Sequence, residues 1–266
     1  MIQRQFKLGT TSFIYPDHII PNVRKTGKFF DELELLVFES LPEEVLPSKV
    51  DVRELTGLGR DLDLGYNVHL PVDVSLTAKS AQDRQLAADT LKHVLDRFAP
   101  LTPTTCTLHL DMDRNLSDPD DIRTWEERAR KGLGLLVPGL DDPGMISVET
   151  LWYDPAPLLP LVREFGLSLC ADAGHHFKYG YDLDRTFEWF KNIAIVHLHG
   201  VDLSGSTPRD HIGLDLLSEF HFEHICNILS EFTGTVSLEV FNYPNLDASL
   251  KRLAKVFSDI PILQRD

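Results

Sequence analysis

The feature that most constrains the fold of this 266-residue chain is a regular alternation of short apolar runs with longer helical patterns. Several of the runs are almost continuously apolar, which is typical of parallel strands that are buried on both faces. Eight such runs are present, and they cover residues 6–13, 32–39, 65–70, 106–111, 146–151, 167–172, 193–199 and 235–241.

Helical patterns lie between these runs, most clearly over residues 79–99, 120–137, 214–232 and 246–257. Asp17 is a candidate cap for a short helix after the first run, and Pro21 limits that helix. Eight strand–helix units in a chain of this length predict an α/β fold, a single (β/α)8 barrel domain over residues 1–266, because such barrels have ~250 residues. An open doubly wound sheet is the alternative, but its first turn is usually glycine-rich. Here that turn reads GTTSFIYP.

Composition narrows the class of protein. The net charge of −15 is a poor match to nucleic acid, although a small anion could still be held by bound cations. Cys106, Cys170 and Cys226 lack CxxC spacing, so we expect reduced, buried residues rather than disulfides. We find neither a signal peptide nor a run of ~20 apolar residues, which predicts a cytoplasmic protein without a membrane span.

Metal-competent side chains recur at the C-terminal end of strand after strand. In a closed barrel these ends converge on one mouth, where isolated buried polar groups would be costly and a shared divalent cation would satisfy them. The sequence therefore predicts a metal centre, although each residue taken singly is also explained by a structural histidine or a buried ion pair. The residues are His69, His109, Asp111, Glu149, Asp172, His175, His176, His197, His199 and Glu239.

Not all candidates carry equal weight. Because side chains alternate along a strand, Asp111 and His199 are weaker than their partners His109 and His197. Glu39, which ends the second strand, is better explained by a structural role than by support of the metal centre. The histidines in helical or loop contexts are interpreted as surface or packing residues, namely His18, His93, His221 and His224.

The loop over residues 202–213 is long, polar and rich in glycine and proline, so it is a candidate active-site loop. Arg209 suits a phosphate group, and His211 suits a further metal or a general-acid role. An ordinary solvated loop is the alternative.

Together these residues resemble the xylose isomerase-like barrels, which include keto-sugar isomerases and epimerases and the apurinic-site DNA repair endonucleases. The shared core reads Glu149, Asp172-Ala-Gly-His175, His197 and Glu239, and this spacing favours His175 over His176. The endonuclease branch adds two early histidines, which His69 and His109 match. It also has Asp-x-His in the loop after strand seven, where this chain instead has Arg209 two residues before His211.

A closer resemblance, over nearly the whole chain, is to the cobamide-remodelling phosphodiesterases. It is carried by LGTTSFIYPDHIIPNVR, LVFES, YNVHLP, DAGH, VHLHGVD, RDHIGLD and LEVF. The resemblance implies a metal-dependent hydrolase that cleaves the nucleotide-loop phosphodiester of cobamides. The products would be a cobinamide phosphate and an α-riboside, and the activity would serve corrinoid salvage.

The resemblance also implies a set of roles. Glu149 would bridge two divalent metal ions, and a third ion is an open alternative. The nitrogen and oxygen ligands suit Zn²⁺, Mn²⁺, Fe²⁺ or Co²⁺, and the expected ligands include no thiolate. The catalytic candidates are Glu149, His175, His211 and Glu239. His69 and His109 would complete the site of one ion, and Asp172, His197 and Glu239 the site of the other. His175 and His211, with Asp210, would hold a third ion or steady the leaving oxygen. Arg209 and Asp210 would bind the substrate phosphate.

Two alternatives remain open. A sugar isomerase or epimerase would use one metal ion, with Glu149 and Glu239 as its acid/base pair. A non-catalytic corrinoid- or sugar-binding barrel would hold no metal at the strand ends. The acidic charge disfavours the DNA repair branch, so the expected partner is a small-molecule cobamide, with neither nucleic acid nor membrane.

Overall fold

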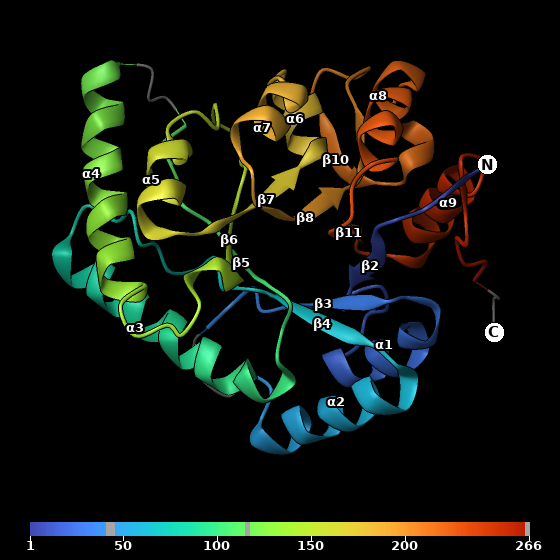
Figure 1. The fold of residues 1–266 in the computed structure, drawn as a ribbon, viewed down its shortest axis with the longest axis horizontal. Coiled ribbons are helices and arrows are strands. Elements are labelled where there is room, and N and C mark those ends of the chain that lie inside the picture. The colour runs from blue at the N-terminus through green and yellow to red at the C-terminus, as the bar shows by residue number, and fades with distance from the viewer. Residues whose placement is uncertain (41–45, 115–117, 264–266) are drawn as a thin grey trace.

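The computed structural model describes residues 1–40, 46–114 and 118–263. Eight parallel strands close into a barrel in the order β11-β2-β3-β4-β5-β6-β7-β8, and helices form a layer outside it (Figure 1). The predicted (β/α)8 fold is therefore confirmed. The barrel strands are β2 (Lys7–Thr11), β3 (Glu32–Leu36), β4 (Gly65–His69), β5 (Cys106–Leu108), β6 (Ile146–Glu149), β7 (Ser168–Asp172), β8 (Ile193–Leu198) and β11 (Thr235–Leu238).

The outer layer contains α-helices and short 3-10 turns. The α-helices are α1 (Ile19–Thr26), α2 (Lys49–Leu62), α3 (Ala81–Phe98), α4 (Pro119–Leu136), α5 (Leu158–Phe165), α6 (Ala173–Tyr179), α7 (Leu183–Trp189), α8 (Glu219–Leu229) and α9 (Tyr243–Leu253). The 3-10 turns are η1 (Gly27–Phe29), η3 (Ala99–Leu101), η4 (Pro143–Met145) and η5 (Leu214–Leu216).

Local capping explains where several helices begin. Ser48 and Asp51 form a reciprocal capping box at the start of α2. The predicted helix 214–232 is divided into η5 and α8, because the Ser218 side chain accepts the backbone N–H of His221 and caps α8. The expectation for Asp17 is wrong: His18 occupies the N-cap of α1, and Asp17 Oδ1 only accepts the His18 N–H (2.9 Å).

The predicted active-site loop after β8 is more ordered than expected. It folds into an antiparallel pair, β9 (Gly200–Asp202) and β10 (Arg209–Ile212), with a register shift between Arg209 and Ile212. A second small pair, β1 (Ile2–Gln3) and β12 (Phe257–Ser258), joins the two ends of the chain near α9 (Figure 1).

The barrel interior is unusually polar. Glu32, Glu34, Asn67 and Ser237 are all fully buried there. Two hydrogen bonds compensate for their burial, since Asn67 Nδ2 donates to Glu32 Oε1 (2.7 Å) and Ser237 Oγ donates to Glu34 Oε2 (2.7 Å). Polar side chains therefore continue from the floor of the barrel to its mouth.

Two predictions from composition can be compared with the structure. Cys106, Cys170 and Cys226 are free and buried, as expected. Among the helices that the structure describes, none combines the length and the apolar character needed to cross a membrane.

Candidate metal centre

Side chains from several strands converge at the C-terminal mouth of the barrel and form four overlapping donor groups, three of which contain no sulfur. Within each group, the possible ligand atoms lie within 4.8 Å of one another. The first group contains His69, His109 and Glu149, the second Glu149, Asp172, His197 and Glu239, and the third Asp172, His175, His199 and His211. Because Glu149 belongs to the first and second groups and Asp172 to the second and third, these three groups form one continuous centre.

The first group is oriented by the backbone. His69 Nδ1 donates to the carbonyl oxygen of Leu70 (3.0 Å), which fixes the ring so that Nε2 lies 3.3 Å from Glu149 Oε2. His109 Nε2 lies 2.9 Å from the same carboxylate oxygen. Asp111, a weaker candidate, lies outside the group with Oδ1 4.0 Å from His109 Nδ1. Two imidazole nitrogens thus share one buried carboxylate oxygen.

The second group is held in place by Glu34, a buried residue that was not among the candidates from the sequence. Glu34 Oε1 accepts a hydrogen bond from His197 Nε2 (2.9 Å), and both side chains are fully buried. This hydrogen bond leaves His197 Nδ1 facing Glu239 Oε2 at 3.3 Å and Glu149 Oε2 at 3.8 Å. A carboxylate that holds the far nitrogen of a histidine is a common support for a metal ligand.

A signal for Glu34 was present in the sequence. The strand reads ELELL, so Glu32 and Glu34 share one face of an otherwise apolar run. Glu39, which was considered for such a supporting role, is exposed.

We expect Glu34→Gln to weaken metal binding by about 10- to 100-fold while the fold is retained, because the neutral amide holds the His197 imidazole less firmly. Isothermal titration with Zn²⁺ measures the change. Glu32→Gln on the same strand is the matched control, because Glu32 is equally buried but pairs with Asn67 and Thr104 on the barrel floor. Equal metal affinity in both variants would contradict the role of Glu34.

The third group is formed by histidines from α6 and from the segment after β8. His199 Nδ1 lies 3.2 Å from the carbonyl oxygen of Gly200 and 3.0 Å from the backbone nitrogen of His211, and its Nε2 lies 3.2 Å from Asp172 Oδ1. The rings of His199 and His211 are stacked with centroids 4.2 Å apart. His211 Nε2 lies 3.3 Å from Glu239 Oε2, and His175 Nδ1 lies 3.1 Å from Asp172 Oδ2. This group therefore adjoins the second one on two sides.

The lower weight given to His199 was wrong. Residues two positions apart on a strand point to the same side, so alternation does not separate His199 from His197. His176 lies outside the groups, because its Nδ1 contacts the Asp172 carbonyl oxygen (2.8 Å) and its Nε2 contacts Thr186 Oγ1 (2.9 Å). The other histidines outside the groups are His18, His93, His221 and His224.

The β9–β10 segment brings only part of its predicted set to the centre. His211 joins the third group with a left-handed backbone (φ 52°), a strained conformation that occurs often at functional sites. Asp210 Oδ1 lies 3.5 Å from His211 Nδ1, and Asp210 Oδ2 accepts from Lys178 Nζ (2.6 Å). Arg209 is exposed and donates to Asp202 (2.6 Å), so the structure does not place it in the donor groups.

Opposite charges dominate the electrostatics of the centre. Burial acts to raise the pKa of Glu149, but neighbouring imidazoles, above all that of His109, outweigh it and hold this pKa well below its ordinary value. Burial acts to lower the pKa of His211, but the carboxylates of Asp210 and Glu239 outweigh it and raise this pKa to about 11. Carboxylates and imidazoles therefore stabilise each other's charged forms.

The residues fit a divalent metal. Among the described residues, four buried donor atoms in these groups have no hydrogen-bond partner, namely Asp172 Oδ2, His197 Nδ1, His199 Nε2 and Glu239 Oε2. Leaving such atoms unpaired is costly, and a shared cation would satisfy them.

One buried cysteine lies beside two of the donor residues. Cys170 Sγ lies in a further group with Glu149 and His197. Burial raises the pKa of the Cys170 thiol, so it is protonated near neutral pH unless a cation displaces the proton.

Known proteins with related sequences or structures include endonucleases and sugar epimerases. The "Probable endonuclease 4" of Aster yellows witches'-broom phytoplasma (strain AYWB) is 21% identical over 227 residues, 72% of this chain and 74% of that protein. The structure of a D-tagatose 3-epimerase-like protein has a TM-score of 0.76 and 17% identity, covering 94% of this chain and 96% of that one. Endonuclease IV from Thermus thermophilus has a TM-score of 0.71 and 17% identity, covering 94% of this chain and 100% of that one.

These likenesses share one fold, and at such low identity the solved structures show the fold alone. The model of one family matches residues 20–260, which is most of the chain and includes every member of the three donor groups. The protein belongs to the xylose isomerase-like TIM barrel family.

Proposed function

We propose that this protein is a metal-dependent phosphodiesterase that cleaves the nucleotide-loop phosphodiester of cobamides into a cobinamide phosphate and an α-riboside. The observation that carries the hydrolase part is the sharing of Glu149 and Asp172 between donor groups. A carboxylate shared in this way is suited to bridging neighbouring ions, as in centres that hydrolyse phosphate esters.

Bound divalent ions would neutralise charge on the phosphate oxygens and lower the pKa of a water molecule. The exposed fractions of the side chains show where the substrate can enter, since His109, His175 and His211 are 19%, 12% and 24% exposed, whereas Glu149 is 2% exposed. In the hydrolysis, the water oxygen bonds to phosphorus, the bond from phosphorus to the ribose oxygen breaks, and that oxygen takes up a proton. His211 lies on the open edge, 24% exposed, so a protonated His211 that holds no ion is placed to donate this proton.

The cobamide part of the proposal is supported by the sequence segments that resemble the cobamide-remodelling enzymes. GTTS covers the end of β2, and LVFES begins at the last residue of β3. Both segments therefore lie at the mouth, where the part of a substrate that extends beyond the metal centre would be held. The partner under this proposal is a small molecule.

The test is to incubate protein loaded separately with Zn²⁺, Mn²⁺, Fe²⁺ or Co²⁺ with adenosylcobalamin and to separate the corrinoids by chromatography. We expect cobinamide phosphate with at least one metal and none with chelator-treated protein. An intact corrinoid with all four metals would refute the proposal.

A one-metal sugar isomerase or epimerase is the second candidate. It is favoured by the second donor group, which by itself offers four ligands. Two of these are carboxylates from different strands, Glu149 on β6 and Glu239 after β11, with β7 and β8 between them. This candidate predicts one tightly bound ion per chain and epimerisation of a ketose, whereas the phosphodiesterase predicts at least two ions. Metal analysis together with a ketose assay separates the two.

A further inference from the structure

One side of the mouth carries an aromatic surface that the metal centre does not use. Phe13 follows β2, Phe38 follows β3, and Phe241 follows β11, and these three strands are neighbours in the barrel. The ring centroids of Phe13 and Phe38 are 6.1 Å apart, and those of Phe38 and Phe241 are 6.0 Å apart. We call these three residues the phenylalanine arc.

The phenylalanine arc is continuous with the metal centre. The ring of Phe241 stacks on the imidazole of His211, with centroids 5.3 Å apart and an interplanar angle of 22°. From this contact the arc extends outward to Phe38 and Phe13, which are 39% and 44% exposed. A molecule whose phosphate reached the third donor group would therefore lie next to these rings.

The loops that carry the arc are held in place by the very segments that resemble the cobamide-remodelling enzymes. The buried Asn22 of IPNVR accepts the backbone N–H groups of Ile14 (3.0 Å) and Tyr15 (2.8 Å), directly after Phe13. It also donates to carbonyl oxygens in the same loop. The loop is therefore preorganised in the position that exposes the ring.

The second loop is fixed in a similar way. Ser40 of LVFES donates from Oγ to Asp73 Oδ1 (3.0 Å), and its backbone N–H donates to Asp73 Oδ2 (2.9 Å). These bonds join the loop after β3 to the loop after β4. In addition, the carbonyl oxygen of Phe38 accepts a hydrogen bond from the backbone N–H of Val72 (3.3 Å), and the Val72 side chain is 39% exposed. Apolar side chains that hydrogen-bonded backbone segments hold in solvent indicate a binding surface rather than accidental exposure.

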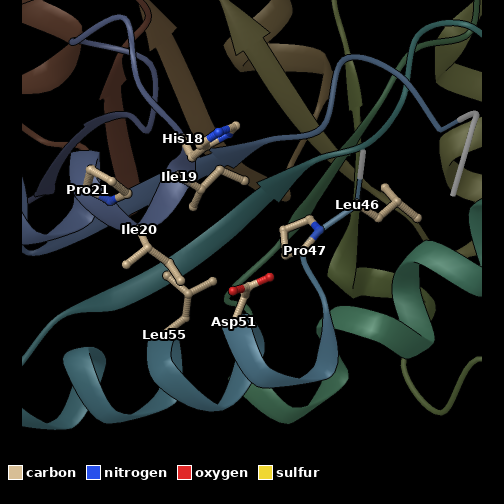
Figure 2. A pocket seen from close by; sticks show the side chains of 8 residues that line it. All are labelled: His18, Ile19, Ile20, Pro21, Leu46, Pro47, Asp51 and Leu55. Atoms are coloured by element: carbon tan, nitrogen blue, oxygen red, sulfur yellow. The ribbon is translucent and has the colours of Figure 1, made fainter. Parts of the chain in front are cut away.

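The apolar surface continues beyond the arc. Phe38 lines a cavity of about 290 Å³ together with Ile19 and Pro47. The same Ile19 and Pro47 line a second cavity of about 420 Å³, where Ile20 and Leu55 face each other between α1 and α2 (Figure 2). Polar side chains also line these cavities, namely Glu39 in the first and His18 and Asp51 in the second, so apolar surface continues only in part on the side of β2 and β3.

We propose that the phenylalanine arc is the apolar platform against which the corrin macrocycle packs while the phosphodiester reaches the metal centre. This inference rests on the proposed function. The rings of the arc meet edge to face, with interplanar angles of 86° between Phe13 and Phe38 and 73° between Phe38 and Phe241, so they form a continuous apolar ridge. Covering this ridge with a large macrocycle removes apolar surface from water. The phosphodiester is attached at the edge of the macrocycle, and the arc adjoins the metal centre through Phe241.

The test compares the double variant Phe13→Ala/Phe38→Ala with wild type in cobalamin hydrolysis by metal-loaded protein. We expect KM to rise by about tenfold or more, since each lost ring face removes apolar contact with the substrate. We expect kcat, the bound metal and the hydrolysis of bis(p-nitrophenyl) phosphate to change by less than about twofold, because none of the donor atoms is altered. Phe220→Ala on α8, where the ring is 74% exposed, is the matched control.

The outcomes separate the two claims. If wild type hydrolyses cobalamin and the double variant keeps the same KM, the arc is not the platform, while the proposed function stands. If wild type neither binds nor hydrolyses any corrinoid, both claims fall. Sedimentation adds a third outcome: a wild-type dimer that the double variant dissociates would show that the arc binds a second copy of the chain, and the inference would be overturned. The Phe13→Leu/Phe38→Leu variant, which retains apolar bulk, controls for folding.

Discussion

Replacing Glu149 by Gln is expected to abolish metal-dependent turnover, lowering it by more than about 100-fold, and to release metal from the protein. The amide keeps the shape of the side chain but loses the charge that three donor groups share through one carboxylate. Because the affected atoms lie at the strand ends and not in the apolar core, we expect the fold to persist. Metal content by mass spectrometry, circular dichroism and cobalamin turnover measure the three parts of this prediction.

The matched control is Glu188→Gln on α7, an exposed carboxylate outside every donor group. We expect it to keep both metal and activity. If Glu149→Gln kept full metal content and turnover, the centre would have been assigned to the wrong residues. If it failed to fold, the carboxylate would act chiefly as the charge partner of His69 and His109.

The second large effect is expected for Gly174→Ala, in the Asp-Ala-Gly-His segment. A Cβ atom at this position would lie 2.0 Å from His199 Cε1 and 2.3 Å from His199 Nε2. The His199 ring cannot yield easily, because it is fully buried and stacked on His211. We expect the free energy of unfolding to fall by about 1–3 kcal/mol. Urea denaturation measures this loss.

The same substitution should also disturb the third donor group, because the displaced His199 ring moves away from Asp172. We therefore expect weaker metal binding in addition to the loss of stability. Gly134→Ala in α4 is the control, since no atom lies within 4 Å of the added Cβ, and it should stabilise the helix by about 0.5–1 kcal/mol. Equal stability of the two alanine variants would show that Gly174 is not constrained by His199.

Much of the fold follows from local patterns. The eight apolar runs, and the helical stretches with their period of about 3.6 residues, are local features that a short segment shows irrespective of the rest of the chain. Closure of a parallel barrel then places every C-terminal strand end on one mouth. For that reason His69, Glu149 and Glu239, which are far apart in the chain, could be assigned to one place before the structure was considered.

Local patterns did not reveal how side chains are oriented and paired across the barrel. Glu34 supports His197 over a separation of 163 residues, and that pairing depends on which side chains face each other across the interior. The segment after β8 folds as a hairpin, in which Arg209 donates a hydrogen bond to Asp202. Asp210 accepts a hydrogen bond from Lys178. The sequence by itself determined the barrel and the residue types at its mouth. Only the tertiary structure decided which nitrogen and oxygen atoms converge, since hydrogen bonds between distant strands fix each ring and carboxylate.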